Sequence, residues 1–167
     1  MAYKEYLLKR KKGAKEILLS ILIYVVALIL SFVCILSASS LAGIGLLLSV
    51  ACFYGGYWLT SKLNREFEYT FTDDSVDIDV IYNASRRKRL ISFDLKDAEI
   101  IAPIKSGEYK RFEKGDYKEI DATTNSKNAN VYFAVVNKNG NFIVKFEPPV
   151  TALQELRKFA PSKVVID

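Results

Sequence analysis

The chain has 167 residues, of which 50% are hydrophobic and 26% charged, and this size suits one modest domain with an accessory segment. It contains no histidine, so it lacks the most common general base near neutral pH and the most common metal ligand. Of the net charge of +5, residues 1–16 contribute +4 and residues 61–167 contribute +1, so the charge balance does not indicate a nucleic-acid-binding domain.

Residues 17–60 contain no charged side chain and predict a transmembrane helical hairpin. A helix over Ile17–Ser37 would reach about 30 Å, which is the thickness of the hydrocarbon core of a bilayer. A second apolar run, Leu41–Thr60, follows after only a few small residues, so the two helices must run antiparallel. Tyr54, Tyr57 and Trp58, near the end of the second run, fit the aromatic belt of a membrane interface.

Two other interpretations of this segment stay open. The basic start and the small residues Ser37-Ala38-Ser39 resemble a cleaved signal peptide, although the apolar stretch is longer than in such peptides and a second span follows. The segment is also compatible with a helical hairpin buried in a soluble core, but the rest of the chain is short for covering 44 uncharged residues. The transmembrane hairpin is therefore the favoured interpretation.

The flanking charges predict the orientation of the hairpin. Residues 1–16 are expected to form a basic cytoplasmic segment, and Lys62 and Arg65 follow the second span. The positive-inside rule then places both termini in the cytoplasm. We expect a two-span protein of the cell membrane, with residues 61–167 as its cytoplasmic domain. The juxtamembrane basic residues, which serve general anchoring or contact acidic lipid, are Lys9, Arg10, Lys11 and Lys12.

Small residues recur four apart in both spans, and this spacing allows helices to approach closely in lipid. The pairs are Ala27/Ser31, Ala51/Gly55 and Cys52/Gly56. They could pack the two helices of the hairpin against each other or form the interface of a homodimer, and the sequence leaves both uses open. The two cysteines are expected to serve as small apolar residues of the spans. The residues expected to pack in the membrane are Ala51, Cys52, Gly55 and Gly56.

After the hairpin the hydrophobic period changes to two, which predicts strands. Phe67, Tyr69 and Phe71 alternate with polar residues, and a turn at Thr72–Ser75 separates them from a second alternating run. Seven strands are expected in all, and residues 105–117 are expected to form a polar loop. The predicted strands are 66–72, 76–81, 86–94, 98–104, 118–124, 131–137 and 142–147.

The last two strands are predicted to form a hairpin. Asn139 and Gly140 lie between them, and this pair favours a two-residue type I′ turn because both residues tolerate positive φ. That register pairs Phe133 with Phe146 on one face of the sheet and places Lys145 on the other.

An amphipathic helix is predicted over Thr151–Ala160, because Leu153, Leu156 and Ala160 recur at helical spacing opposite a polar face. This order of elements, together with the segment Phe67–Asp94 after a short helical hairpin, resembles bacterial membrane-anchored PH-like proteins such as the YcxB-like group. It also resembles a small family of Firmicutes membrane proteins. The resemblance implies an α+β membrane protein with a PH-like seven-stranded sandwich or barrel closed by a C-terminal helix. No catalytic motif comes with it.

The densest basic cluster beyond the N-terminal segment consists of Arg86, Arg87, Lys88 and Arg89. On a domain tethered to a membrane, these residues could contact anionic lipid or a partner. Alternatively, they pair with carboxylates across the strand, since a two-residue turn places Asp79 opposite Lys88 and a three-residue turn places it opposite Arg89. The sequence does not decide between the two registers.

The densest group of carboxylates is Asp73, Asp74, Asp77 and Asp79. Carboxylates can hold Mg²⁺ or Ca²⁺, but the ligand spacing of a calcium loop is absent, so a turn and a solvated strand face account for them better. The sequence also lacks a Gly-rich phosphate loop and the Cys/His spacing of a zinc site. It therefore predicts neither a cofactor nor a metal site, and no enzyme active site.

The favoured function is that of a non-enzymatic membrane protein whose cytoplasmic PH-like domain scaffolds or recruits a protein partner. The alternative is an accessory subunit of a larger membrane complex or transporter, in which the hairpin packs against other spans. A sensor of anionic lipid or of a metabolite, acting through Arg86–Arg89, is a further alternative.

Overall fold

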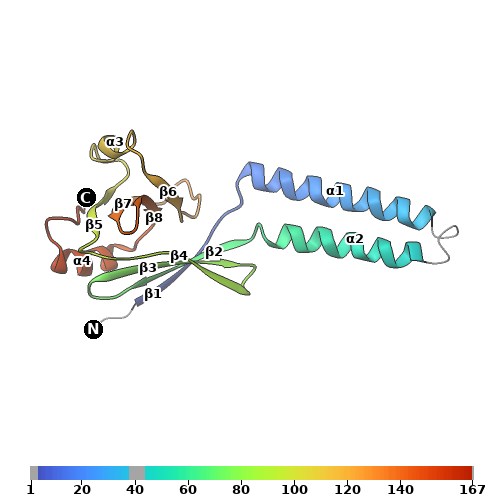
Figure 1. Ribbon diagram of the computed structural model, residues 1–167, viewed down its shortest axis with the longest axis horizontal. Coiled ribbons are helices and arrows are strands. Elements are labelled where there is room, and N and C mark those ends of the chain that lie inside the picture. Colours follow the sequence, from blue (N-terminus) through green and yellow to red (C-terminus); the bar gives the residue numbers. More distant parts are fainter. Residues whose placement is uncertain (1–3, 38–43, 167) are drawn as a thin grey trace. The chain divides into compact units, whose positions relative to one another are not determined.

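The computed structural model describes residues 4–37 and 44–166, and the chain divides into two compact units (Figure 1). Residues 12–65 form one unit, which is a helical hairpin. The other unit combines the N-terminal residues up to Lys11 with the residues from Glu66 onward. The predicted tip of the hairpin, around Ser39, lies outside the described residues.

The hairpin consists of helix α1, Ala14–Leu36, and helix α2, Ile44–Ser61. Helices of 23 and 18 residues are about 35 Å and 27 Å long at 1.5 Å per residue. Helix α1 begins before the apolar run because Gly13 caps it: the Gly13 N–H donates a 2.9 Å hydrogen bond to the Glu16 carboxylate.

Small side chains bring α1 and α2 together. Gly56 lies so close to α1 that a Cβ added to it would stand 2.9 Å from the Cβ of Ala27. Ser31 donates a buried 2.9 Å hydrogen bond from its Oγ to the backbone carbonyl of Ser49. Close approach and an interhelical hydrogen bond hold two apolar helices together even where no hydrophobic effect acts between them.

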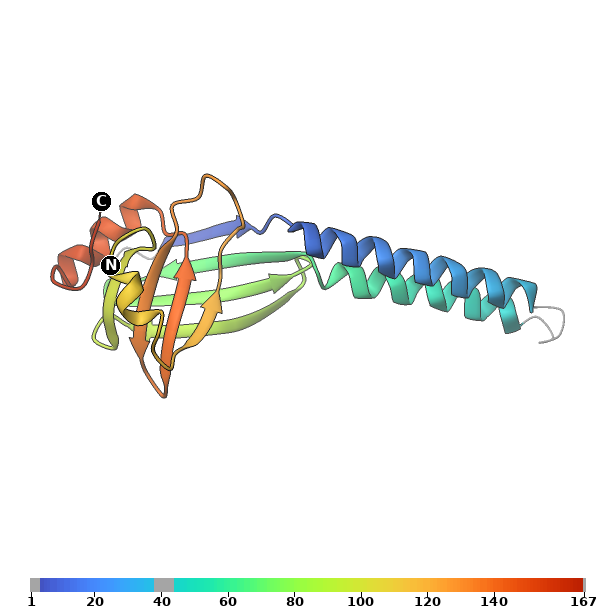
Figure 2. The ribbon, with the colours of Figure 1, turned by 90° about the horizontal axis from the view of Figure 1, so that it is seen from above.

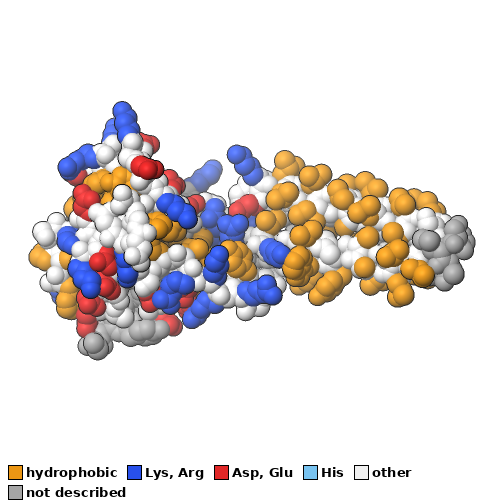
Figure 3. All heavy atoms as spheres, viewed as in Figure 1, with side chains coloured by type: hydrophobic (Ala, Val, Ile, Leu, Met, Phe, Trp, Pro, Cys, Tyr) orange, Lys and Arg blue, Asp and Glu red, His pale blue; other side chains and the backbone are white. Residues whose placement is uncertain are grey.

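Most of the apolar surface of the two helices is exposed (Figure 3). Both helices are long and apolar enough to cross a membrane, and only 17% of the most apolar stretch of α1 and 22% of that of α2 are buried. A helical hairpin that formed the core of a soluble domain would be mostly buried. So large an exposed apolar surface instead indicates a surface that contacts lipid or protein.

The other unit contains, among the described residues, eight strands in two four-stranded sheets (Figure 2). The strand order is β1-β2-β3-β4 in the first sheet and β5-β7-β8-β6 in the second, where β6 runs parallel to β8. The first sheet comprises β1 (Lys4–Lys9), β2 (Arg65–Phe71), β3 (Ser75–Tyr82) and β4 (Arg86–Asp94). The second comprises β5 (Ala98–Pro103), β6 (Lys118–Asp121), β7 (Tyr132–Asn137) and β8 (Asn141–Phe146).

Strand β1 corrects the prediction of seven strands. Residues 4–9, which we expected in a basic segment preceding the spans, pair antiparallel with β2 from Lys4 opposite Phe71 to Lys9 opposite Glu66. Tyr6 and Leu8 pack against the core, while Glu5, Leu7 and Lys9, which alternate with them, are exposed. The helical hairpin is therefore inserted between two paired strands of one sheet.

The main core lies between the sheets and helix α4, Val150–Phe159. Phe67 and Tyr69 of β2 and Leu153 of α4 are at most 2% exposed. The Tyr69 hydroxyl donates a 2.6 Å hydrogen bond to the carbonyl of Ala122 and accepts one from the Glu147 N–H. Burial raises the pKa of Tyr69 above its ordinary value, although the hydrogen bond from Glu147 favours the phenolate.

The predicted register of the last hairpin is wrong by one residue. Phe146 lies opposite Tyr132, and Phe133 lies opposite Lys145. Three residues, 138–140, separate the paired ends Asn137 and Asn141, and Gly140 adopts a φ of +137°. A three-residue loop closes the hairpin instead of the predicted two-residue turn.

Both faces of this sheet are buried, which is why the hydrophobic pattern did not reveal the register. Phe146 lies in the main core, whereas Phe133 and Ile143 lie in a second, smaller core on the other face. Phe112 of the short helix α3, Tyr109–Phe112, covers that face. The segment predicted as a polar loop thus contributes an aromatic side chain to the interior.

Candidate functional site

The basic cluster lies on strand β4, directly after the turn that joins it to β3. Three residues, 83–85, form this turn, and Asn83 and Ala84 both adopt positive φ. The pairing places Asp79 opposite Arg89, and a register shift lies between Ile78 and Asp79. The structure therefore selects the three-residue turn from the two registers that the sequence left open.

Arg87 and Arg89 are committed to ion pairs on one face of the first sheet. Arg89 contacts Asp79 at 2.6 Å through its Nε and Asp77 at 3.2 Å through its Nη1. Arg87 pairs with Glu68 of β2. The Asp79 side chain is 8% exposed, so it depends on Arg89 to offset the loss of hydration. The hydrogen bond to Asp79 in turn raises the pKa of Arg89.

Arg86 and Lys88 have a different role, because side chains alternate between the faces of a strand. They lie opposite Tyr82 and Val80 in the ladder, and both are exposed. Within residues 4–37 and 44–166, neither side chain forms a hydrogen bond or an ion pair. The cluster is thus divided into two cations that pair with carboxylates of the sheet and two that are exposed and have no such partner in the described part of the chain.

This division predicts different effects of the same substitution. Arg89→Gln should lower the free energy of unfolding by about 1–3 kcal/mol, because it leaves buried carboxylate oxygens without their charged partner. Arg86→Gln should change it by less than about 0.5 kcal/mol, as is usual for an exposed side chain without partners. Pulse proteolysis of the full chain in urea and mild detergent would measure both. Equal losses in the two variants would show that the assignment is wrong.

The β3–β4 turn lies at one end of the first sheet, together with the ends of β1 and β2 that lead to the helices. Antiparallel order brings Lys9, Glu66 and Tyr82 to this end, and Lys9 contacts Glu66 at 3.5 Å. The chain leaves β1 after Lys9 and enters α1 at Ala14, and it leaves α2 at Ser61 and enters β2 at Arg65. Both connections start or finish at this end of the sheet.

Three of the four predicted juxtamembrane residues make contacts within the unit that contains the sheets. Arg10 contacts Asp121 at 3.5 Å and lies over the ring of Phe67, while the Lys11 N–H donates a 2.8 Å hydrogen bond to the carbonyl of Thr124. Lys12 is the first residue of the hairpin unit. Two of the four residues thus make contacts that join β1 to the second sheet, a role that the charge pattern did not reveal.

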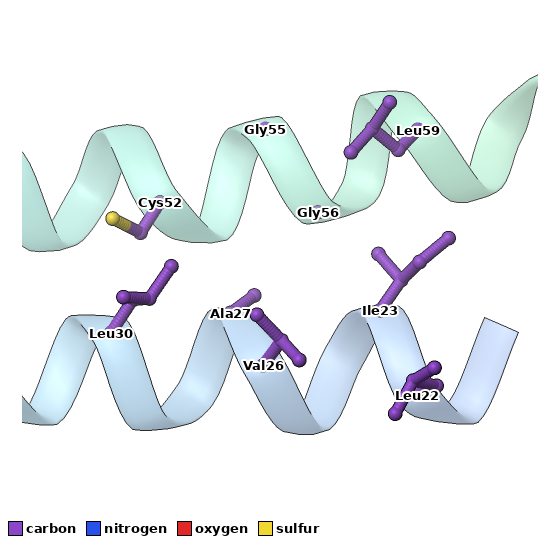
Figure 4. Close-up of a pocket in the computed structure, with 9 residues that line it drawn as sticks. All are labelled: Leu22, Ile23, Val26, Ala27, Leu30, Cys52, Gly55, Gly56 and Leu59. Carbon is purple, nitrogen blue, oxygen red and sulfur yellow. The ribbon is translucent and has the colours of Figure 1, made fainter. Parts of the chain in front are cut away.

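Three of the predicted packing residues of α2, Cys52, Gly55 and Gly56, line one apolar groove of about 340 Å³ together with side chains of α1 (Figure 4). Gly56 faces α1 and packs against Ala27, as a hairpin-packing role requires. A Cβ added to Gly55, by contrast, would meet no atom within 4 Å, so Gly55 makes no such close contact. Ala51 is exposed. The described cysteines Cys34 and Cys52 are free thiols.

The carboxylates of β3 are engaged by arginine. Asp77 and Asp79 share Arg89, as the ion-pair interpretation of the basic cluster predicts, and Asp79 is buried, so the prediction of a solvated strand face is wrong for Asp79. Within the described part of the chain, no group of three or more Asp, Glu, Cys or His side chains could hold a metal ion.

Comparison with known families identifies the domain. Residues 2–166 match the model of the family described as "Bacterial PH-like domain (DUF6106)". This match confirms the resemblance to bacterial PH-like proteins, and it extends over both the hairpin and the sheets. No curated protein and no solved structure matches the chain.

Proposed function

The chain belongs to the bacterial PH-like domain family DUF6106, and from this premise we propose that it is a membrane-anchored, non-enzymatic protein whose PH-like domain scaffolds or recruits a protein partner. The observation that carries this proposal is the insertion of two exposed apolar helices between the paired strands β1 and β2. The fold by itself does not specify a function. A membrane anchor narrows the possible functions, because it restricts the domain to partners that reach a membrane surface.

The position of α1 in the fold argues for an anchor that stays attached. Cleavage after a signal peptide would remove β1 together with α1. Strand β1 covers the edge of β2 along Lys4–Lys9, and Tyr6 and Leu8 pack against the core. A cleaved product would therefore lose the strand that pairs with β2 and two side chains that pack against the core.

Basic residues flank the start of α1 and the end of α2, and they support a cytoplasmic location of the domain. Lys12 and Lys15 lie at the start of α1, and Lys62 follows α2. The Nζ of Lys62 lies 3.3 Å from the centre of the Trp58 ring, a pairing that suits a membrane interface. Under the positive-inside rule, this charge supports a cytoplasmic location of the domain.

Recruitment is a role that the surface of the PH-like domain supports. The domain has a groove of about 360 Å³ with a mixed lining that includes Tyr132, Val150 and Lys127. A groove of this size can hold one or two side chains of a partner segment. We therefore assign partner binding to the domain and membrane attachment to the hairpin.

Thiol labelling in intact cells tests the anchor and its orientation. In a Cys34→Ala, Cys52→Ala background, cysteines introduced as Lys11→Cys and Lys127→Cys should resist a membrane-impermeant maleimide until the cells are permeabilised. A cysteine introduced as Ser39→Cys should react in intact cells. Resistance of the membrane-bound chain to extraction by alkaline carbonate is the control. Labelling at position 127 in sealed cells would contradict the proposed orientation.

The groove of α1 and α2 favours a second candidate function, that of an accessory subunit of a larger membrane complex. An apolar groove that contains Gly55 lets another transmembrane helix approach closely. Purification of the full chain in mild detergent separates the candidates. A stable multi-span partner would favour the accessory subunit, and a soluble partner would favour recruitment by the domain. Recovery of the chain alone as a monomer would weaken both.

A further inference from the structure

Two exposed cations, Arg86 and Lys88, are the charged groups of the basic cluster that the fold does not use. Arg87 and Arg89 have carboxylate partners, and Arg86 and Lys88 have none among the described residues. Ion pairing within the sheet therefore accounts for half of the cluster and leaves the other half without a structural role.

The position of these cations in the sheet indicates which surface they could contact. They follow the β3–β4 turn, at the end of the sheet where Lys9 and Glu66 pair. Connections of four residues, 10–13, and three residues, 62–64, join this end to the helices. Four extended residues span at most about 14 Å, so covalent connection alone keeps this end of the domain close to any bilayer that holds the hairpin.

We propose that Arg86 and Lys88 form a docking contact with the anionic lipid surface in which the hairpin is embedded. This inference rests on the proposed membrane anchor. Anionic headgroups attract basic side chains near the surface, and the anchor removes most of the entropic cost of bringing the domain there. The contact would hold the domain in one orientation on the membrane and thereby determine which of its surfaces a partner can reach.

Another explanation of Arg86 and Lys88 must be distinguished from lipid binding. Strand β4 is an edge strand, and charged side chains protect such edges against pairing with other chains. Under that explanation, removal of the two charges would promote self-association and would leave the environment of the turn unchanged. An acidic protein partner would likewise leave the turn insensitive to lipid composition in a purified system.

The test uses the full chain reconstituted into vesicles. In the Cys34→Ala, Cys52→Ala background, Ser85→Cys places an environment-sensitive fluorophore on the turn, where Ser85 is exposed. Vesicles consist of phosphatidylcholine alone or of its mixture with phosphatidylglycerol, each with brominated lipid as a quencher. Two basic residues near an anionic surface should raise the ratio of docked to undocked domains by roughly tenfold or more. Quenching should therefore be stronger in the anionic vesicles.

Salt and matched variants complete the design. High salt should abolish the additional quenching, because it screens exposed charges. Arg86→Gln with Lys88→Gln should abolish it as well. Lys110→Gln with Lys114→Gln removes the same charge from exposed positions elsewhere in the domain and should leave it unchanged. Equal quenching in the Arg86/Lys88 variant and its parent would overturn the proposal, and so would equal quenching in the two kinds of vesicle.

Failure of this inference differs from failure of the proposed function. A chain that stays in neutral vesicles after a carbonate wash, but whose turn does not respond to anionic lipid, retains the anchor and lacks the docking contact. A chain released by the wash lacks the anchor itself. Self-association of the Arg86/Lys88 variant without a change in quenching would assign the two cations to protection of the edge strand and would overturn the docking contact.

Discussion

Deletion of residues 1–9 is expected to abolish cooperative folding of the PH-like domain. The deletion removes strand β1, so the backbone groups of β2 that it pairs with lose their partners and the core loses Tyr6 and Leu8. Strand β2 carries Phe67 and Tyr69, two of the largest buried side chains of the domain. Limited proteolysis of the membrane-bound chain would measure the effect, with the deleted chain cleaved throughout the domain under conditions in which the parent resists.

A point variant separates the loss of strand pairing from an effect on the membrane helices. Leu7 is 57% exposed and alternates with the two packed residues of β1, so Leu7→Ser keeps the backbone pairing and should leave protease resistance unchanged. Membrane association should survive in both variants, because α1 and α2 are intact. A deleted chain with the protease resistance of the parent would show that β1 is dispensable and that the domain is complete from β2 onward.

Phe146→Ala is expected to lower the free energy of unfolding of the domain by about 3–5 kcal/mol, as other deletions of a buried ring do. Phe146 is fully buried, and its ring centre lies 6.1 Å from that of Tyr69 in an edge-to-face arrangement. The loss approaches the whole stability of a typical small domain, so the variant should unfold at low urea concentration. Pulse proteolysis in urea, applied to the full chain in mild detergent, measures the change.

The same substitution at Phe159 provides the matched control. Phe159 lies in the last turn of α4 and is 53% exposed, so Phe159→Ala should cost less than about 1 kcal/mol. A small loss at Phe146, comparable to that at Phe159, would contradict the placement of β8 between its neighbours in the second sheet.

Local patterns were sufficient where one face of an element is buried. The alternation of Phe67, Tyr69 and Phe71 predicted β2, because one side of that strand packs against the core and the other does not. The uncharged stretch of residues 17–60 likewise predicted two apolar helices, since a run of that composition has few other stable forms. In both cases the physical cause acts within a window of a few residues and is therefore visible in the sequence.

Local patterns failed for β1 and for the register of β7 and β8. Strand β1 carries a weak alternation of Tyr6 and Leu8 among charged residues, and its partner β2 lies more than fifty residues further along the chain. In the last hairpin, Phe133 and Phe146 are both apolar but belong to different cores, so hydrophobicity did not distinguish the faces. Turn chemistry favoured two residues, and packing on both faces selected three.

Composition and periodicity were enough to predict an uncharged pair of helices, a strand-rich domain, a C-terminal amphipathic helix and a basic cluster at Arg86–Arg89. The insertion of the hairpin between β1 and β2 became visible only in the folded chain, as did the difference between Arg87 and Arg89, which have carboxylate partners, and Arg86 and Lys88, which have none among the described residues. The two groups of features differ in the sequence distance over which their physical causes act. Composition and periodicity reflect the environment of neighbouring residues, whereas strand pairing and ion pairing depend on residues that are distant in sequence and on turns whose length packing selects.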